Sequence, residues 1–408
     1  MIIANIGRII GILDESVERL RGHEMDDVYC IDDAWLSYDD GVITGFGEMR
    51  SCPVNDNIVD AGGGILIPAF CDSHTHIVWA GDRSGEFVDK IEGRTYEEIA
   101  ANGGGILNSS DLLNSVTDDE LYRSAARRLR QMMAMGTGAV EIKTGYGLTL
   151  DGELKMMRVI ERLRADFPQV EIKATFLGAH AVGRAYAGRQ ADYVRHVIDD
   201  MLPQMAGRAD FVDVFCDKGF FTVEETDRIL KAAKTLGMMP KIHANELDCS
   251  GGVQVGVANG ALSVDHLERM GDEEIRLLAQ SDTVATMLPG ASFFLGMPYG
   301  QARKAVDEGC AVALASDYNP GSSPSGSMPF VMSLGCIKMK LSPERALNAV
   351  TINGAAAMGL SSRCGSITRG KNASFVLYKP YAHSLPYIIH AYSEPTIAAV
   401  YLKGQRVI

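Results

Sequence analysis

Through the middle of the chain, short apolar segments alternate with longer amphipathic ones. A strand of a parallel sheet is buried on both faces and reads as a continuous apolar run, whereas a surface helix repeats its apolar residues every three or four positions. The alternation therefore predicts β–α units. The eight expected strands are Phe70–His76, Gly138–Lys143, Glu171–Gly178, Asp210–Phe215, Lys241–His243, Leu262–His266, Val284–Leu288 and Val312–Asp317.

Eight such units in sequence favour an α/β fold of the (β/α)8 barrel type, which needs about 250 residues. Helix signals fall between the strands: Thr117–Glu120 and Thr222–Glu225 have capping-box spacing, and Ser342–Pro343 is a helix start. Helices are expected to end at Gly136 and Gly237. The alternative is an open, doubly wound sheet. A G-x-G-x-x-G turn after a strand would support it, and the sequence has none.

The two ends of the chain differ from the middle and are rich in short strands and turns. Trp35–Ile43 is a hairpin candidate with Asp40-Gly41 as its turn, and Ala373–Tyr378 and Ala398–Leu402 continue this β character near the C-terminus. We therefore expect residues 1–66 and 361–408 to form one small β-sandwich domain beside a barrel of residues 67–360.

The composition restricts the class of protein. The 408 residues carry a formal net charge of −13, which argues against a nucleic-acid partner. No apolar run has the length of a membrane span and the N-terminus lacks a signal-peptide pattern, so a cytoplasmic protein with no membrane partner is expected. None of the eight cysteines forms a C-x-x-C pair, which indicates reduced thiols rather than a thiolate metal site.

The strongest local signal of chemistry is the pair His74 and His76 at the end of the first barrel strand. Residues two apart in a strand project to the same side, so both imidazoles can enter the barrel mouth. Three more strands end in candidate ligands, namely His243, His266 and Asp317. Barrel enzymes carry their chemistry at the carboxyl ends of strands, and imidazole with carboxylate suits zinc and similar metals. If these residues had only structural roles, the placement of His or Asp at the ends of four separate strands would be a coincidence.

The segment Ile67–His76, the later single histidines, the strand-end Asp317 and the tail Gly365–Lys371 together resemble the amidohydrolase superfamily. Ala69 and Ser374 stand where that superfamily usually has Gly and Asp, and both lie outside the candidate metal ligands.

Within the superfamily, several blocks between residues 60 and 330 resemble the imidazolonepropionase family in order and spacing. These blocks are His74–Arg83, Gly103–Ile106, Glu141–Leu148, Phe176–His180, Lys241–Glu246 and Ser316–Ser323. The resemblance implies hydrolytic ring opening of 4-imidazolone-5-propanoate to N-formimidoyl-L-glutamate, a step in histidine degradation. It further implies one zinc or iron ion held by His74, His76, His243 and Asp317.

Hydrolysis of a ring amide needs an activated water, a base that takes its proton and an acid that protonates the leaving nitrogen. Glu246, three residues past His243, can reach such a water. His266 can orient the water or polarise the carbonyl, and Asp317 can share the base role. The sequence does not rank these three residues.

The resemblance also implies a set of substrate contacts. Arg83 would pair with the propionate in bidentate fashion. The other implied contacts are Tyr96, Tyr146, His180, Glu246, Asn319, Gly321 and Ser322. Taken singly, the tyrosines and His180 also suit structural roles. The sequence of Asn319–Gly321 favours a tight turn whether or not these residues bind substrate.

Two other functions remain open on the sequence. A deaminase of a small ring amidine would share the barrel and the metal, and ammonia release would distinguish it. A non-catalytic scaffold of the same fold should have lost ligands, yet all four are present. Related barrels are often dimers, so analogy suggests a homodimer as the only macromolecular partner.

Overall fold

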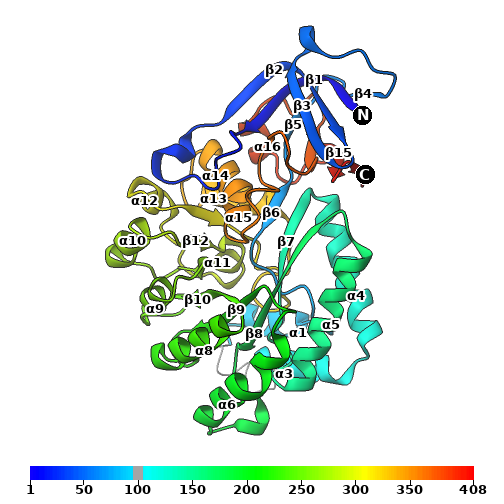
Figure 1. Ribbon diagram of the computed structural model, residues 1–408. Helices are drawn as coiled ribbons and strands as arrows, with labels where there is room; N and C mark the ends of the chain where they lie inside the picture. The colour runs from blue at the N-terminus through cyan, green and yellow to red at the C-terminus, as the bar shows by residue number, and fades with distance from the viewer. Residues whose placement is uncertain (95–103) are drawn as a thin grey trace.

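The computed structural model describes residues 1–94 and 104–408, and its strands form two sheets. One sheet is parallel and is surrounded by helices, whereas the other lies at one end of the molecule and contains both chain termini (Figure 1).

The parallel sheet confirms the predicted barrel. Its strands follow one another in chain order, each paired with the next: β6 (Phe70–Asp72), β7 (Thr137–Lys143), β8 (Glu171–Ala179), β9 (Phe211–Cys216), β10 (Met239–Ala244), β11 (Ser263–His266), β12 (Val284–Met287) and β13 (Val312–Leu314). All residues of β7 and β9 are buried, as expected for strands covered on both faces, although these strands also carry the charged residues Glu141, Lys143 and Asp213.

Closure of the barrel comes from residues beyond the regular strands. β6 ends at Asp72 and β13 at Leu314, both earlier than the sequence predicted. The segments that follow still pair, because Asp317 N donates to His74 O at 3.0 Å and His76 N donates to Tyr318 O at 3.0 Å. This parallel bridge joins the first and last strands and places the predicted ligands of both side by side.

Helices between and after the barrel strands pack around the barrel (Figure 1). Those described are α1 (Ser84–Ile91), α3 (Gly105–Ser115), α4 (Asp118–Ala134), α5 (Leu150–Asp166), α6 (Gln190–His196), α7 (Leu202–Met205), α8 (Val223–Thr235), α9 (Gly252–Ala258), α10 (Asp272–Ala279), α11 (Pro289–Leu295), α12 (Ala302–Asp307), α13 (Met328–Ile337), α14 (Pro343–Val350), α15 (Ile352–Ala356) and α16 (Leu385–His390).

The predicted helix signals are confirmed where the structure tests them. Thr117 and Thr222 each accept a hydrogen bond from the backbone N–H three residues on, and both capping boxes are complete. Ser342 caps α14 directly before its proline. Gly136 and Gly237 follow α4 and α8 with φ of 99° and 82°, the left-handed conformation that glycine adopts without strain.

The terminal sheet is built from both ends of the chain. Its strands are β1 (Ile2–Ile12), β2 (Tyr29–Asp39), β3 (Val42–Glu48), β4 (Ile58–Asp60), β5 (Ile65–Pro68), β14 (Phe375–Tyr378), β15 (Ile397–Leu402) and β16 (Gln405–Arg406). The predicted hairpin is β2–β3, and Asp40 and Gly41 at its turn both have positive φ, as a type I′ turn requires.

The larger buried apolar cluster of this sheet includes the fully buried residues Ile3, Ile9, Leu36 and Phe375. β5 and β14 pair directly, so the two ends of the chain share one sheet. The domain boundaries at 66/67 and 360/361 stay predictions. No helix in the described part of the chain is long and apolar enough to cross a membrane.

Candidate active site

The two histidines after β6 lie against the aspartate after β13. His74 Nε2 and His76 Nε2 are 3.3 Å apart, and each is 3.6 Å from Asp317 Oδ1. All three side chains are buried. The pairing that closes the barrel therefore brings together ligands that are more than two hundred residues apart in the sequence.

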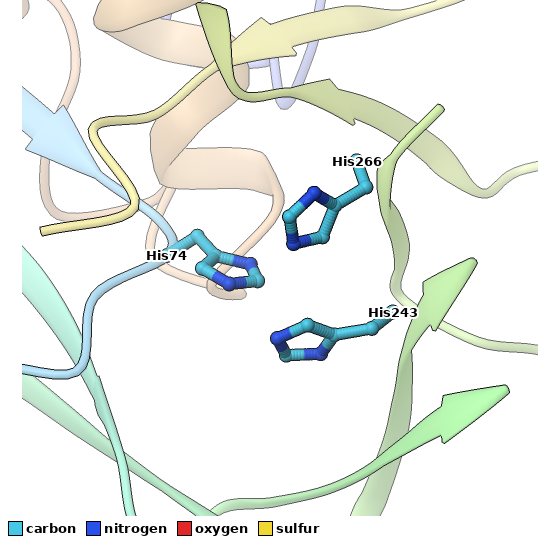
Figure 2. A group of neighbouring side chains, drawn as sticks. All are labelled: His74, His243 and His266. Atoms are coloured by element: carbon cyan, nitrogen blue, oxygen red, sulfur yellow. The ribbon is translucent and has the colours of Figure 1, made fainter. Parts of the chain in front are cut away.

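Two further histidines reach the same centre from the neighbouring strands β10 and β11. The ring centroid of His74 lies 4.5 Å from that of His243 and 5.5 Å from that of His266. Figure 2 shows these three imidazoles pointing toward one another from separate strands. Nitrogen and oxygen atoms lie within 4.8 Å of one another in two triads, His74–His243–His266 and His74–His76–Asp317, and both include His74.

Backbone strain is concentrated at these strand ends. His266 has φ of 86°, Asp317 has φ of 52° and Asn245, next but one to His243, has φ of 57°. L-residues other than glycine rarely adopt such angles, and they persist where the surrounding structure enforces them, often at functional sites. The strain turns each chain segment sharply at the barrel mouth.

The environment keeps the candidate ligands in the form that binds metal. Burial lowers the pKa of His74 and of His76 well below the usual range, so both imidazoles are neutral. His74 Nδ1 lies 2.7 Å from Asp265 Oδ2, and His243 Nδ1 lies 2.8 Å from Asp213 Oδ2. Each carboxylate favours a proton on Nδ1, which leaves Nε2 with its lone pair directed at the centre.

The donor set fits a divalent cation. Among the described residues His243 Nε2 has no hydrogen-bond partner although it is buried. Buried polar atoms are rarely left unpaired, and a bound ion is one explanation for such a gap. Imidazole nitrogens with one carboxylate oxygen are ligands that zinc and iron both accept.

His266 differs from the other histidines because two carboxylates flank it. Its Nε2 lies 3.6 Å from Glu246 Oε2 and its Nδ1 lies 3.4 Å from Glu268 Oε2. Burial alone would lower the pKa of His266, but the two glutamates raise it well above its ordinary value. A protonated imidazole is a hydrogen-bond donor and has no lone pair for a metal.

Glu246 stands at the edge of this cluster, at the start of the loop after β10. Burial raises the pKa of its carboxyl to about 7, while the facing His266 acts in the opposite direction. A carboxylate whose pKa lies near neutrality is well matched to taking and returning a proton at physiological pH.

An ionic layer of five fully buried side chains, Glu141, Lys143, Asp213, Lys241 and Asp265, lies beneath the histidines. Lys143 Nζ lies 2.5 Å from Glu141, 2.7 Å from Asp213 and 3.5 Å from Asp265. Lys241 pairs with Glu141 and donates to Ser73 O at 2.9 Å. The carboxylates that orient His74 and His243 are thus joined through one ammonium group.

Arg83 forms a bidentate pair with Glu86, with Nε–Oε1 of 2.8 Å and Nη2–Oε2 of 2.6 Å. Both side chains are largely buried. A Cβ atom added to Gly321 would overlap the Arg83 guanidinium, so a larger residue here would require the Arg83 side chain to move. Arg83 and Gly321, both predicted substrate contacts, therefore lie next to each other.

Tyr146 and His180 line the same side of the centre. The His180 ring stacks on His76 with centroids 5.4 Å apart, and Tyr146 lies 5.4 Å from His180. His180 Nδ1 donates to Gly145 O at 3.0 Å, and burial lowers the pKa of His180 to about 3. His180 is therefore neutral, with Nε2 left as an acceptor. Tyr96 lies outside the described residues.

Asn319 organises the turn after Asp317. Its Oδ1 accepts from Gly321 N at 2.7 Å and from Ser322 N at 2.8 Å, and its Nδ2 donates to Asp317 O at 2.7 Å. Ser322 Oγ donates to Asp317 Oδ2 at 3.2 Å. The Asn319 side chain is thus used within the turn, and Ser322 holds the candidate ligand.

Sequence reasoning missed the residues that support the site from below and beside it: Glu86, Asp213, Asp217, Lys241, Asp265 and Glu268. One signal was available, because a charged residue inside a buried strand is costly unless paired. Glu141 with Lys143, and Lys241 with His243, are separated by two positions and so face the same side of their strands.

Residues 65–407 match the amidohydrolase family. The chain is 47% identical over 408 residues to the imidazolonepropionase of Flavobacterium psychrophilum, with 99% of both chains covered. It is 48% identical to that of Flavobacterium johnsoniae, again over 99% of both chains, and 42% identical to that of Clostridium tetani, over 90% of this chain and 89% of the relative. The chain belongs to the imidazolonepropionase family.

Solved structures agree with the fold of this imidazolonepropionase family member. A triazine hydrolase variant superposes with a TM-score of 0.76 at 16% identity, over 99% of this chain and 94% of the other. A 5-methylcytosine deaminase from Klebsiella pneumoniae gives a TM-score of 0.73 at 17% identity, over 98% and 97%. At such identities the likeness concerns the barrel and the terminal sheet. The amidohydrolase family is metal-dependent, in keeping with the histidine and aspartate cluster.

Proposed function

We propose that this protein is an imidazolonepropionase that hydrolyses 4-imidazolone-5-propanoate to N-formimidoyl-L-glutamate in histidine degradation. The observation that carries the proposal is the near full-length similarity to imidazolonepropionases at 47–48% identity. Water adds to the ring carbonyl and the C–N bond of the cyclic amide breaks. The ring nitrogen takes up a proton as this bond breaks and stays bonded to the formimidoyl carbon of the product, so no ammonia is released.

The proposed metal ligands are His74, His76, His243 and Asp317, for one zinc or iron ion per chain. Their buried donor atoms and the two carboxylates behind His74 and His243 support this choice. His266 is left out of the set because its two glutamate neighbours favour its protonated form. A metal held by these four residues would lower the pKa of a bound water and polarise the carbonyl oxygen.

Glu246, His266 and Asp317 are the proposed groups for proton transfer and charge stabilisation. Glu246 accepts the proton of the attacking water, since its pKa is near neutral, and then returns it to the ring nitrogen. His266, as a cation, donates to the carbonyl oxygen as negative charge develops on it. Asp317 is held by Ser322 and orients the water rather than acting as the main base.

The remaining proposed contacts bind and orient the substrate. Arg83 pairs with the propionate, with Gly321 leaving room for the guanidinium. Tyr146 and His180 form one wall, and His180 Nε2 accepts from a ring N–H. Ser322 and the backbone N–H groups of the Asn319 turn complete the pocket, and Tyr96 is assigned here from the family resemblance alone.

We further propose that the protein is cytoplasmic and forms a homodimer. All eight cysteines are free thiols, which suits a reducing compartment. The homodimer rests on analogy with related barrels. The substrate is a small molecule, and the net charge of −13 offers no general attraction to nucleic acid.

The decisive assay mixes purified protein with freshly prepared imidazolone propionate and follows the loss of the ring's ultraviolet absorbance. Metal content is measured on the same sample. Rapid loss with about one metal per chain is the expected result. Ammonia release without formation of N-formimidoyl-L-glutamate would instead identify a ring deaminase, and an inert, metal-free protein would leave only a scaffold.

A further inference from the structure

Asp217 lies directly after β9 and is almost fully buried. β9 and β10 are neighbouring parallel strands, with Cys216 paired to Ala244, so Asp217 stands beside the start of the loop that carries Glu246. Sequence analysis assigned it no role.

The Asp217 carboxylate accepts hydrogen bonds along that entire loop. Its Oδ2 accepts from Glu246 N at 2.8 Å and from Leu247 N at 2.9 Å. Its Oδ1 accepts from Asp248 N at 3.1 Å and from Ser250 Oγ at 2.8 Å. Lys218 N adds a further bond to Oδ1 at 2.7 Å. We refer to the segment Glu246–Ser250, bound in this way, as the Glu246 loop.

These contacts use the full acceptor capacity of the carboxylate. An ionised carboxylate has two oxygens with about four lone-pair directions and donates nothing. Here five donors converge on it, and within the described chain none of the ion pairs involves Asp217. The group is therefore a scaffold for neutral donors, four of them backbone N–H groups, rather than the partner of a cation.

The geometry connects this scaffold with the chemistry. Asn245 has φ of 57° and turns the chain out of β10, so the position of the next residue depends on what holds its backbone. That residue is Glu246, whose Oε2 lies 3.6 Å from His266 Nε2. Its backbone N–H is bound by Asp217. A shift of about 1 Å in a catalytic group can cost on the order of 100-fold in rate.

We propose that Asp217 is a positioning residue that fixes the Glu246 loop and thereby sets the place of the Glu246 carboxylate beside His266. The inference rests on the proposed role of Glu246 in proton transfer. It predicts that Asp217 contributes to the rate through Glu246 and through nothing else in the site.

A double-mutant cycle of Asp217→Asn and Glu246→Gln tests this. In Asp217→Asn, an NH2 group that cannot accept a hydrogen bond replaces one carboxylate oxygen and faces at least two of the five donors. The Glu246 loop should then be held less firmly, so kcat should fall about 10- to 100-fold while KM changes less. Glu246→Gln should lower kcat about 100-fold or more. The double variant should be no slower than Glu246→Gln by more than about 3-fold, because the lost contact would act on a group already disabled.

The matched control is Asp248→Asn, an exposed carboxylate in the same loop that faces Lys218 and the backbone of Cys249. It should retain the wild-type kcat. Metal content should equal that of the wild type in every variant, since none of the three residues is a proposed ligand. Wild-type kcat for Asp217→Asn, or losses that multiply in the double variant, would overturn the positioning role.

Two outcomes separate the inference from its premise. If Glu246→Gln keeps the wild-type rate, the proposed role of Glu246 fails and this inference fails with it, while ring opening itself still stands. If Asp217→Asn does not fold, Ser250→Ala removes one donor from the same carboxylate. It should lower kcat about 3-fold, in keeping with one lost hydrogen bond, and should have no effect in the Glu246→Gln background.

Discussion

At the scale of single residues, histidines of the same site differ in their protonation states. His74 and His76 are neutral because burial lowers the pKa of each, whereas Glu246 and Glu268 raise the pKa of His266 despite its burial. The same cluster thus contains neutral imidazoles, which are the proposed metal ligands, and a candidate cation. Environment, rather than residue type, separates the proposed ligands from the proposed proton-transfer groups.

His243→Ala is expected to lose metal and activity together, because its Nε2 has no other described partner and Asp213 holds its Nδ1. Metal catalysis of this kind contributes several kcal/mol, so kcat should fall roughly 1000-fold. Metal analysis and the absorbance assay measure both effects. The control is His383→Ala, an exposed histidine outside the barrel mouth. A metal-replete, active His243→Ala would contradict the ligand assignment.

Arg83→Ala should mainly raise KM for the propionate substrate. Hydrogen bonds to charged groups contribute about 1.5–3 kcal/mol, so kcat/KM should fall about 10- to 150-fold. The loss also leaves Glu86 without its partner, close to the substrate carboxylate. Steady-state kinetics measures the change, with the exposed Arg123→Ala as control. Unchanged kinetics would refute the contact.

At the scale of elements, the barrel strands carry two layers of polar side chains. The candidate metal ligands lie at or just beyond the carboxyl ends of the strands, and the ionic layer lies beneath them. Lys143 on β7 joins Asp213 on β9 with Asp265 on β11. Burial alone would lower the pKa of Lys143, but the three carboxylates around it raise it above its ordinary value. These ion pairs hold β7, β9 and β11 in fixed positions relative to one another. Because Asp265 contacts His74 and Asp213 contacts His243, they also fix the orientation of these two histidines.

Lys143→Met keeps the length of the side chain and removes the charge. Removing one partner of a fully buried ion pair lowers the free energy of unfolding by about 3–5 kcal/mol, because the carboxylates remain buried without their cation. Denaturant unfolding of the metal-free protein measures this loss. Lys231→Met is the control, since its pair with Asp227 is exposed and is expected to contribute less than about 1 kcal/mol. Equal effects of the two substitutions would show that the layer contributes no special stability.

At the scale of the whole molecule, the proposed metal would link the first, fifth and eighth barrel segments, the first and last of which meet where the barrel closes. His74 and Asp317 are joined there by a backbone hydrogen bond of 3.0 Å. A ligand that binds only the folded state stabilises it in proportion to the logarithm of its concentration over Kd.

Chelation should therefore lower the melting temperature and abolish activity together. A metal at a thousandfold excess over Kd contributes about 4 kcal/mol to the free energy of unfolding. Calorimetry with and without chelator measures the shift, and readdition of zinc or iron identifies the ion that restores the rate. His243→Ala should show no chelator effect. If chelation changed neither the melting temperature nor the rate of the wild-type protein, a structural or catalytic metal would be excluded.

The sequence determined the barrel, because apolar strands and capped amphipathic helices follow one another with local signals at Thr117, Thr222 and Ser342. It also predicted the candidate ligands, since His74, His76, His243, His266 and Asp317 stand at strand ends, where a barrel exposes side chains to one mouth, and the family resemblance implied four of them without His266. These inferences depend on period and position along the chain, which are local properties.

Only the tertiary structure decided which distant charges meet. Nothing along the chain pairs Lys143 with Asp213 and Asp265, or Asp217 with the Glu246 loop, because those contacts depend on the register between neighbouring strands. Closure of the barrel beyond β6 and β13 likewise depends on backbone pairing between Thr75 and Tyr318. The protonation states of His266 and Glu246 follow from the same packing, since burial and facing charges act through space rather than along the sequence.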